Sequence, residues 1–275
     1  MPALTSGAVP TNNAVVAIDA EVHGTDRATG TMLGSEVTRR CGPDGLPDGT
    51  IDIRLIGTAG QSLGAFLPRG IDITLTGDAN DYVGKGLSGG TVVVRPHPEA
   101  PAGGDGQVIA GNTIGYGATS GTLYLRGTVG ERFAVRNSGA LLVCEGTGDH
   151  ALEYMTGGRV IVLGRTGRNV AAGMSGGLAF LLDAAPALVN PDMVELSGPD
   201  DDDTNWLETT LYDYATRTES PLARSLLKDW PTAAARFTRI LPQDYARVLW
   251  VRRRAEIDGL TDAETDALIM EKSHG

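Results

Sequence analysis

The glycine-rich run at residues 84–89 (GKGLSG) matches the GxGxxG fingerprint of dinucleotide-binding loops letter for letter. In such loops a strand precedes the glycines and a helix follows them, so that the pyrophosphate meets the N-terminus of the helix. Here a β-branched run, residues 91–94 (TVVV), follows the glycines directly. Lys85 is not a phosphate-loop lysine either, because Gly86 stands where Ser or Thr is required. The run therefore predicts tight turns rather than a nucleotide site.

Carboxylates are the second group that could do chemistry. Glycoside hydrolysis usually needs two of them, an acid and a base or nucleophile, on either side of the scissile bond. Asp78, Asp81 and Asp149 are the candidates, but they fall in different predicted turns and no aromatic side chains accompany them to hold sugar rings. A self-contained enzyme that acts on a sugar or nucleotide is the alternative hypothesis for this chain.

Histidines and cysteines suggest no metal site, because no histidine lies at ligand spacing from another histidine or from a cysteine. We expect each histidine to be solvated or locally hydrogen-bonded. Cys41 and Cys144 have no CxxC spacing and are predicted to be structural free thiols. The chain has no GxSxG motif, and no cysteine follows Met1 as an N-terminal-cysteine amidotransferase would require. The histidines are His23, His97, His150 and His274.

Composition narrows the possible partners. The chain has 275 residues and a net charge of -11, so nucleic acids and anionic membranes would be repelled. No apolar run approaches the roughly 20 residues that span a bilayer, and no basic region followed by an apolar one suggests a secretory signal. The cytoplasm is the expected location.

The elements that must position these residues repeat along the chain. A glycine stands before each of a series of apolar runs, and by subtraction the intervals between these glycines are 20, 31, 18, 19 and 19 residues. The long interval holds an insertion around residues 96–106. A constant period near 20 residues is typical of a solenoid. The predicted turn glycines are Gly57, Gly70, Gly77, Gly84, Gly86, Gly90, Gly121, Gly139, Gly158 and Gly177.

Equal spacing without Asn-Gly hairpins favours parallel pairing of like strands. We therefore predict a mainly β fold, a right-handed parallel β-helix of about seven coils over residues 50–183. Residues 1–49 would form a flexible lead over residues 1–12, a short strand at 17–22 and a capping helix or strand at 31–40, with Gly42 just beyond its end. Residues 184–275 would form an acidic linker at 198–203 and a helical extension. The helices are expected at 205–216, from Ser220 and Pro221 onward, and at 233–240, 243–256 and 261–270.

Several blocks of the sequence occur in an order that resembles a known family. They are residues 57–66 (GTAGQSLGAF), 77–90 (GDANDYVGKGLSGG), 117–121 (GATSG), 130–139 (GERFAVRNSG), 148–150 (GDH), 153–158 (EYMTGG) and 173–177 (GMSGG). Together they resemble the C-terminal GXGXG domain of the glutamate synthase large (alpha) subunit, over about residues 30–250.

The resemblance implies a place in a larger enzyme. In that family an amidotransferase domain hydrolyses glutamine, and ammonia passes through a tunnel to a synthase domain that carries FMN and an iron–sulfur cluster. The GXGXG domain holds neither nucleophile nor flavin. The resemblance thus implies a non-catalytic structural or interaction subunit or domain, without cofactors of its own, that positions the glutaminase and FMN synthase modules.

Two further expectations follow from the resemblance. The start at Met1 and the small, polar lead favour a separately encoded subunit over an excised piece, although complexes that make other products contain similar subunits. The candidate partner interface is the segment that opens the clearest repeat. Its residues are Asp78, Asn80, Asp81, Tyr82 and Lys85.

Overall fold

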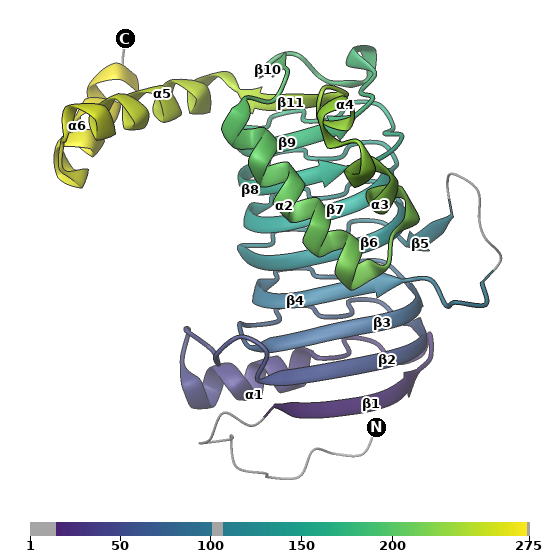
Figure 1. Cartoon of the computed structure of the whole chain (residues 1–275). Helices are drawn as coiled ribbons and strands as arrows, with labels where there is room; N and C mark the ends of the chain where they lie inside the picture. The colour runs from purple at the N-terminus through teal and green to yellow at the C-terminus, as the bar shows by residue number, and fades with distance from the viewer. Residues whose placement is uncertain (1–14, 101–106, 274–275) are drawn as a thin grey trace.

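The centre of the molecule is a stack of parallel strands (Figure 1). The structure is a computed structural model that describes residues 15–100 and 107–273, so the lead at residues 1–12 lies outside the described residues. A short strand, β5 (Val108–Ala110), pairs with β3 and β6 beside the main ladder. The strands of the parallel ladder are β1 (Val16–Val22), β2 (Ile51–Ala59), β3 (Ile71–Ala79), β4 (Ser88–Arg95), β6 (Ser120–Val129), β7 (Ser138–Thr147), β8 (Thr156–Val162) and β9 (Gly176–Leu182).

Aliphatic side chains form continuous columns inside the stack. Ile53, Ile73 and Val92 are successive partners on β2, β3 and β4. The same column continues through the following strands, and all of its members are buried. Because alternate residues of a strand point to opposite faces, such columns need equal spacing in sequence. The predicted parallel β-helix is thus confirmed as a parallel β-solenoid of about six turns. The column continues with Leu123, Leu142, Val160 and Ala179.

Between successive strands lies a six-residue turn segment with an alternating backbone. In the segment at residues 81–86, the second, fourth and sixth residues, Tyr82, Gly84 and Gly86, have φ values of 65°, 64° and 61°. The N–H groups of Tyr82 and Gly86 donate to carbonyls of the following coil, whereas that of Gly84 donates to the preceding coil. The turn segments are therefore hydrogen-bonded to one another much as the strands are. They are residues 61–66, 81–86, 112–117, 131–136, 149–154 and 168–173.

The register differs by one residue from the predicted glycine alignment at two places. Thr91, Thr122, Leu141 and Arg159 are successive partners, and the residue before Leu141 is Ala140, so Gly139 lies one position early. Gly70 is likewise one position early, because Asp72 is the residue that pairs with Thr91. Irregularities between residues 88 and 91, and between 138 and 141, absorb the extra residue. The spacing of glycines in the sequence does not reveal a β-bulge of this kind.

Most of the predicted turn glycines have positive φ. Gly77 is the clearest case, with φ 149° and a position where an added Cβ would lie 1.8 Å from the Gly57 carbonyl oxygen. Gly90 and Gly139 do not have positive φ, but an added Cβ at Gly139 would lie 2.1 Å from the Thr119 oxygen. The glycines with positive φ are Gly57, Gly70, Gly77, Gly84, Gly86, Gly121, Gly158 and Gly177.

The outer face of the sheet changes character along the stack, and the helices follow that change. Val93 on β4 continues into an outward column of apolar residues that includes Tyr124 and Phe180. Helices α2 (Asp201–Thr218), α3 (Pro221–Lys228) and α4 (Trp230–Ala234) cover this apolar part, as Figure 1 shows for α2 and α3 across β6–β9. On β2 and β3 the partners of Val93 are Arg54 and Thr74, which are polar. The helical layer therefore ends where the outward column becomes polar.

The first turn of α2 corrects one prediction. The acidic stretch at residues 198–203 is not a linker throughout, because α2 begins at Asp201. Asp200 is its N-cap, and Asp200 and Asp203 form a capping box in which each side chain accepts from the other's backbone N–H. Carboxylates at a helix N-terminus are stabilised by the helix dipole and by the unpaired N–H groups there. The acidic run is therefore a helix start.

The predicted helix at residues 233–240 is also wrong. Helix α4 ends at Ala234, and residues 237–242 form strand β11 (Phe237–Pro242). This strand pairs antiparallel with β9 on one side and with β10 (Val194–Ser197) on the other. The unpaired edge of β9 offers backbone hydrogen bonds to the returning chain, and Phe237, Thr238 and Ile240 are residue types that favour strands.

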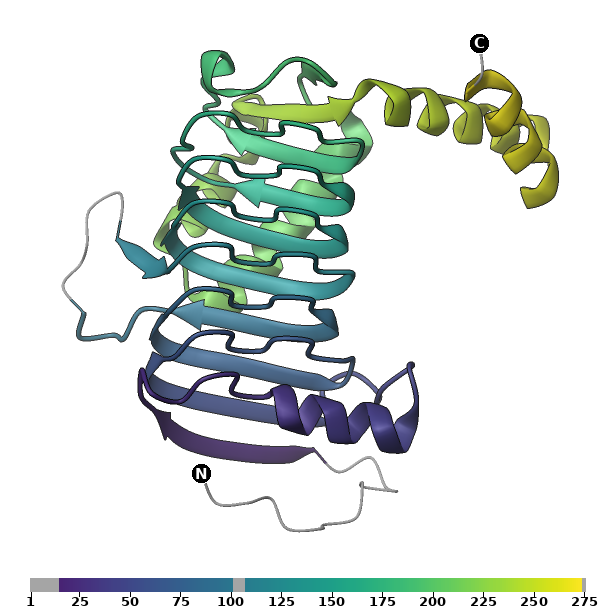
Figure 2. The same ribbon diagram turned by 180° about the vertical axis from the view of Figure 1, so that it is seen from behind.

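The strand predicted at residues 17–22 is β1, and the remaining predicted elements are helices. Ser220 caps α3 and Pro221 is its first residue, as expected. Helix α1 (Thr31–Cys41) ends before Gly42, and it lies beside the lowest turn segments in Figure 2, with Val37 buried in the core. Helices α5 (Gln243–Asp258) and α6 (Asp262–Ser273) project from the end of the stack (Figures 1 and 2). In the described part of the chain, no helix is both long and apolar enough to cross a membrane.

Candidate functional site

The six turn segments create one continuous surface on the side opposite α2 and α3, which we call the turn face (Figure 2). Within each segment the third residue is buried in the core and the second and sixth point outward to different extents. In the first two segments the buried residues are Leu63 and Val83. The turn face is thus made of residues at fixed positions in each repeat.

The first residue of each segment mostly serves the stack itself. Asp81 Oδ1 accepts from the N–H of Asn112 at 2.7 Å, and Asn112 Oδ1 in turn accepts from the N–H of Glu131 at 2.9 Å. Asn80 Oδ1 accepts from the N–H of Asp81 at 2.7 Å. Of the five residues predicted to contact a partner, Asn80 and Asp81 therefore have side chains engaged by the backbone. Asp78 is exposed near the end of β3.

The carboxylates that could have supported a self-contained enzyme do not come together. Asp81 and Asp149 lie in turn segments that two further segments separate. Asp149 accepts from both the backbone N–H and the guanidinium of Arg168, which hold its pKa below the usual range. A carboxylate that stays ionised is poorly suited to donate a proton. The geometry supplies no acid and base pair at these positions.

Tyr82 and Lys85 remain available on the turn face. Tyr82 is partly exposed, and Lys85 Nζ lies 5.6 Å from the centroid of its ring. A cation at this distance from an aromatic face is attracted by the ring quadrupole. The structure thus brings these two predicted interface residues into contact with each other.

Sequence reasoning missed two other exposed aromatic residues on this face. Phe66 and Tyr154 occupy the sixth position of their segments and are 56% and 54% exposed. Each ring lies across a glycine of the next coil, because a Cβ added at Gly86 or Gly173 would come within about 2.6 Å of it. The Arg136 guanidinium lies 5.7 Å from the Tyr154 ring centroid. Phe66 and Tyr154 could have been found in the sequence as aromatic residues at a position where other repeats have glycine.

The glycine run at 84–89 cannot cradle a phosphate in this fold. The N–H groups of Gly84, Lys85 and Gly86 donate to the carbonyls of Leu63, Tyr82 and Tyr116. Strand β4 follows from Ser88, so no helix N-terminus faces the run. Without free N–H groups or a helix dipole, the run has neither of the features that bind pyrophosphate.

His150 belongs to a local network of hydrogen bonds. Its Nδ1 lies 2.7 Å from Glu153 Oε1, which also accepts from Asn169 Nδ2 at 2.9 Å. Asn190 Nδ2 donates to Asn169 Oδ1 at 3.2 Å. These partners satisfy one another, as expected for a locally hydrogen-bonded histidine. In the described residues, no group of three or more His, Cys, Asp and Glu side chains could hold a metal ion.

The remaining histidines and cysteines are dispersed. His23 lies 3.7 Å from Asp26, and His97 Nδ1 accepts from the N–H of Glu99, while His274 lies outside the described residues. Cys41 and Cys144 are both free thiols. Burial raises the pKa of Cys144 to about 12, so its thiol stays protonated and unreactive.

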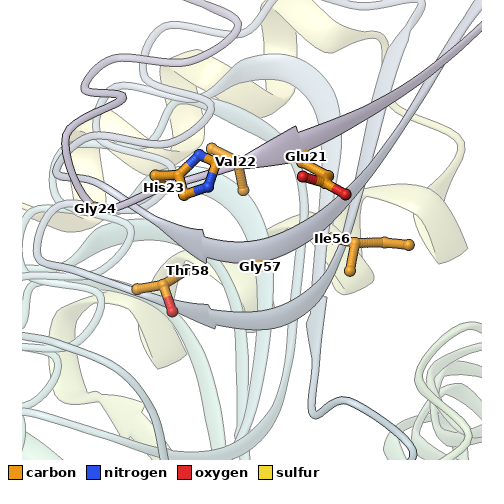
Figure 3. A pocket seen from close by; sticks show the side chains of 7 residues that line it. All are labelled: Glu21, Val22, His23, Gly24, Ile56, Gly57 and Thr58. Atoms are coloured by element: carbon orange, nitrogen blue, oxygen red, sulfur yellow. The ribbon is translucent and has the colours of Figure 1, made fainter.

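A shallow surface pocket lies where β1 and β2 end (Figure 3). Its walls mix charged, polar and apolar side chains, among them Glu21, His23 and Ile56. The pocket contains neither a nucleophile with an adjacent base nor a cluster of cations, so its geometry indicates no specific chemistry.

Comparisons with known proteins agree on the family. The family model described as "GXGXG motif" matches residues 5–243. The chain is 44% identical over 252 residues to the glutamate synthase [NADPH] large chain of Bacillus subtilis, covering 90% of this chain and 17% of that protein. It is 45% identical over 236 residues to the glutamate synthase [NADH] of Schizosaccharomyces pombe, covering 84% of this chain and 11% of that protein.

A third relative is matched over similar shares of the two chains. The glutamate synthase [NADPH] large chain of Azospirillum brasilense is 48% identical over 224 residues, which is 80% of this chain and 15% of that protein. The chain thus spans less than a fifth of the length of these three curated relatives. Since the family model covers most of the sequence, the chain belongs to the GXGXG family and corresponds to the GXGXG domain of glutamate synthase large chains.

Proposed function

We propose that this chain is a non-catalytic structural and interaction component of glutamate synthase or of a glutamate-synthase-like complex. It holds a glutaminase (amidotransferase) module and an FMN-binding synthase module in position relative to each other. FMN and the iron–sulfur cluster belong to those partner modules, and this chain provides no residues for them.

The observation that carries the proposal is that the polar groups of the repeats form hydrogen bonds within the stack. The N–H groups of Gly84 and Gly86 bond to neighbouring coils, and so do the first-position side chains Asp81, Asn112 and Asp149. The chemistry-bearing residue types of the sequence therefore build the stack. A rigid stack with one face covered by its own helices is suited to position other domains.

Reconstitution tests the proposal. The purified chain is mixed with the amidotransferase and FMN synthase proteins of the same organism, and association is measured by size-exclusion chromatography with light scattering. We expect a complex that contains all three proteins and a glutamine-dependent synthase activity that requires this chain. The absence of any complex, together with full activity without the chain, would overturn the proposal.

The alternative function, an enzyme acting on a sugar or nucleotide by itself, has a separate test. Turnover by the isolated chain that disappears in the Asp78→Asn, Asp81→Asn or Asp149→Asn variants would establish it. We expect the isolated chain to be colourless in the visible range and to show no such turnover.

The division of the chain into residues 1–49, 50–183 and 184–275 also remains a proposal. β1 already pairs in register with β2, so the parallel ladder extends into the first of these parts. Limited proteolysis followed by mass spectrometry would show whether cleavage occurs near residues 49 and 184.

A further inference from the structure

Bulky residues stand at left-handed backbone positions on the turn face without being buried. Phe66, Tyr82, Arg136 and Tyr154 have φ values between 55° and 65°. Positive φ is unfavourable for residues with large side chains. All four side chains are exposed. The backbone conformation alone would favour glycine at each of these positions.

At the sixth position, which Phe66, Arg136 and Tyr154 occupy, other repeats show that the fold accepts glycine. The sixth position is Gly86, Gly117 or Gly173 in three of the six segments. At Gly117 an added Cβ would meet nothing within 4 Å, so neighbouring atoms neither clash with a side chain at this position nor pack against one. Fourth-position residues differ in this respect, since Ala134 and Leu152 also have positive φ but are buried in the core. The Phe66 and Tyr154 rings lie across Gly86 and Gly173, but they stay more than half exposed and do not enter the core.

The same surface carries cations without carboxylate partners. Lys85, Arg132 and Arg136 form no ion pair within the described part of the chain. Nearby acids are already engaged, because Asp149 pairs with Arg168 and Glu153 with His150. Asp81 and Glu131 are the two carboxylates of the described turn segments without an ion-pair partner, and Asp81 accepts from the N–H of Asn112. The three unpaired cations and the exposed aromatic rings beside them are complementary to partner carboxylates around an apolar centre.

We propose that this surface, the turn-face patch, docks an acidic protein surface of the glutamate synthase complex, with partner carboxylates around an apolar centre. The inference rests on the proposed function and names the side of the solenoid that meets its partner. Neighbouring coils are about 4.8 Å apart, so the patch extends about 19 Å along the stack, enough for the core of an interface. The opposite face is already covered by α2, α3 and α4. The patch consists of Phe66, Tyr82, Lys85, Arg132, Arg136 and Tyr154.

A double substitution to glycine separates a docking role from a folding role. In the Phe66→Gly/Tyr154→Gly variant the backbone strain is relieved, so we expect an unchanged or higher melting temperature. We also expect the affinity for the partner modules to fall about tenfold or more, because exposed aromatic residues are typical binding hot spots. Tyr212→Ala is the matched control, since Tyr212 is an exposed aromatic residue on α2. This control should leave the affinity unchanged.

The chemistry of the partner has its own readout. A zero-length carbodiimide reagent joins a lysine amine to a carboxylate in contact with it, and mass spectrometry then identifies the linked peptides. We expect Lys85 to be linked to an Asp or Glu of a partner module, and binding to weaken about tenfold in Arg132→Gln/Arg136→Gln and at raised salt.

Each outcome decides between the two proposals. If the wild-type chain forms no complex, both fail. If the wild-type chain and the glycine variant bind equally well, the turn-face patch is wrong and the proposed function stands. A melting temperature that drops clearly in the glycine variant would assign the two rings a packing role on Gly86 and Gly173 and overturn the inference. Self-association of the chain that the glycine variant abolishes would replace the proposed occupant with a second copy.

Discussion

The carboxylate of Glu145 on β7 accepts a hydrogen bond from the hydroxyl of Ser220, the N-cap of α3. The hydroxyl of Tyr214 on α2 lies 3.1 Å from the same oxygen, Glu145 Oε1. Ser220 also accepts from the N–H of Ala223 within α3. One half-buried carboxylate thus joins the strand stack to the junction of the two main helices that cover it.

Glu145 should make the stability of the helical layer depend on pH. Burial is the largest cause that raises its pKa above the ordinary value of 4.5, and the hydrogen bonds from Ser220 and Tyr214 oppose it. The folded chain then binds more protons than the unfolded chain above pH 4.5, so the free energy of unfolding falls as the pH rises through this window. Glu145→Gln should show a shallower fall above about pH 4.5. Urea unfolding at a series of pH values tests this, and parallel curves for the two proteins would contradict it.

Ser220→Ala removes the N-cap of α3 and one partner of Glu145. Loss of an N-cap costs about 1–2 kcal/mol, and the buried carboxylate loses a donor as well. We expect the free energy of unfolding to fall by about 2 kcal/mol in urea. Ser175→Ala, at an exposed serine in the last turn region, is the control and should change it by less than about 0.5 kcal/mol. Equal effects of the two substitutions would argue against the capping role.

Gly77→Ala tests the close approach of neighbouring coils. The added Cβ would lie 1.8 Å from the Gly57 oxygen at a φ of 149°, so the β2 and β3 backbones would have to separate. We expect a loss of more than about 3 kcal/mol or failure to fold, measured by circular dichroism and urea unfolding. Gly198→Ala, where nothing lies within 4 Å, should be neutral. A stable, cooperative Gly77→Ala protein would show that the coils tolerate a wider spacing.

Leu142→Ala tests the inner column of the solenoid. Leu142 is fully buried between Leu123 and Val160, and the methyl groups that would be lost fill space within the stack. The expected cost is about 2–5 kcal/mol, the range for large-to-small core substitutions. Ile56→Ala is the matched control, because Ile56 is on a strand but 55% exposed, and it should cost under about 1 kcal/mol. Similar losses for both would place Leu142 outside the core that stabilises the fold.

Local signals in the sequence were sufficient for much of the architecture. A constant period of apolar runs predicts parallel pairing, because only equal spacing lets Ile53, Ile73 and Val92 stack on one another. The start of α3 is equally local, since Ser220 and Pro221 satisfy the requirements of a helix N-terminus by themselves.

The candidate site was only partly accessible in this way. Tyr82 and Lys85 stand out in the sequence as part of a distinctive repeat, and they do meet on the turn face. Phe66 and Tyr154 did not stand out, because they matter only through their positive φ. The residue type alone does not predict positive φ at an aromatic residue. The turn segments impose that φ, since their alternating N–H groups must reach the coils on both sides.

Tertiary contacts alone decided the remaining features. Residues 237–240 include Phe, Thr and Ile, which favour strands, but the backbone partners that make them a strand come from the open edge of β9. The one-residue offsets of Gly70 and Gly139 arise from irregularities in strand pairing. The periodic pattern of buried residues is a property of the local sequence, so it can be predicted from the sequence alone. Edge pairing and strand register depend on contacts between segments that come together only when the chain folds.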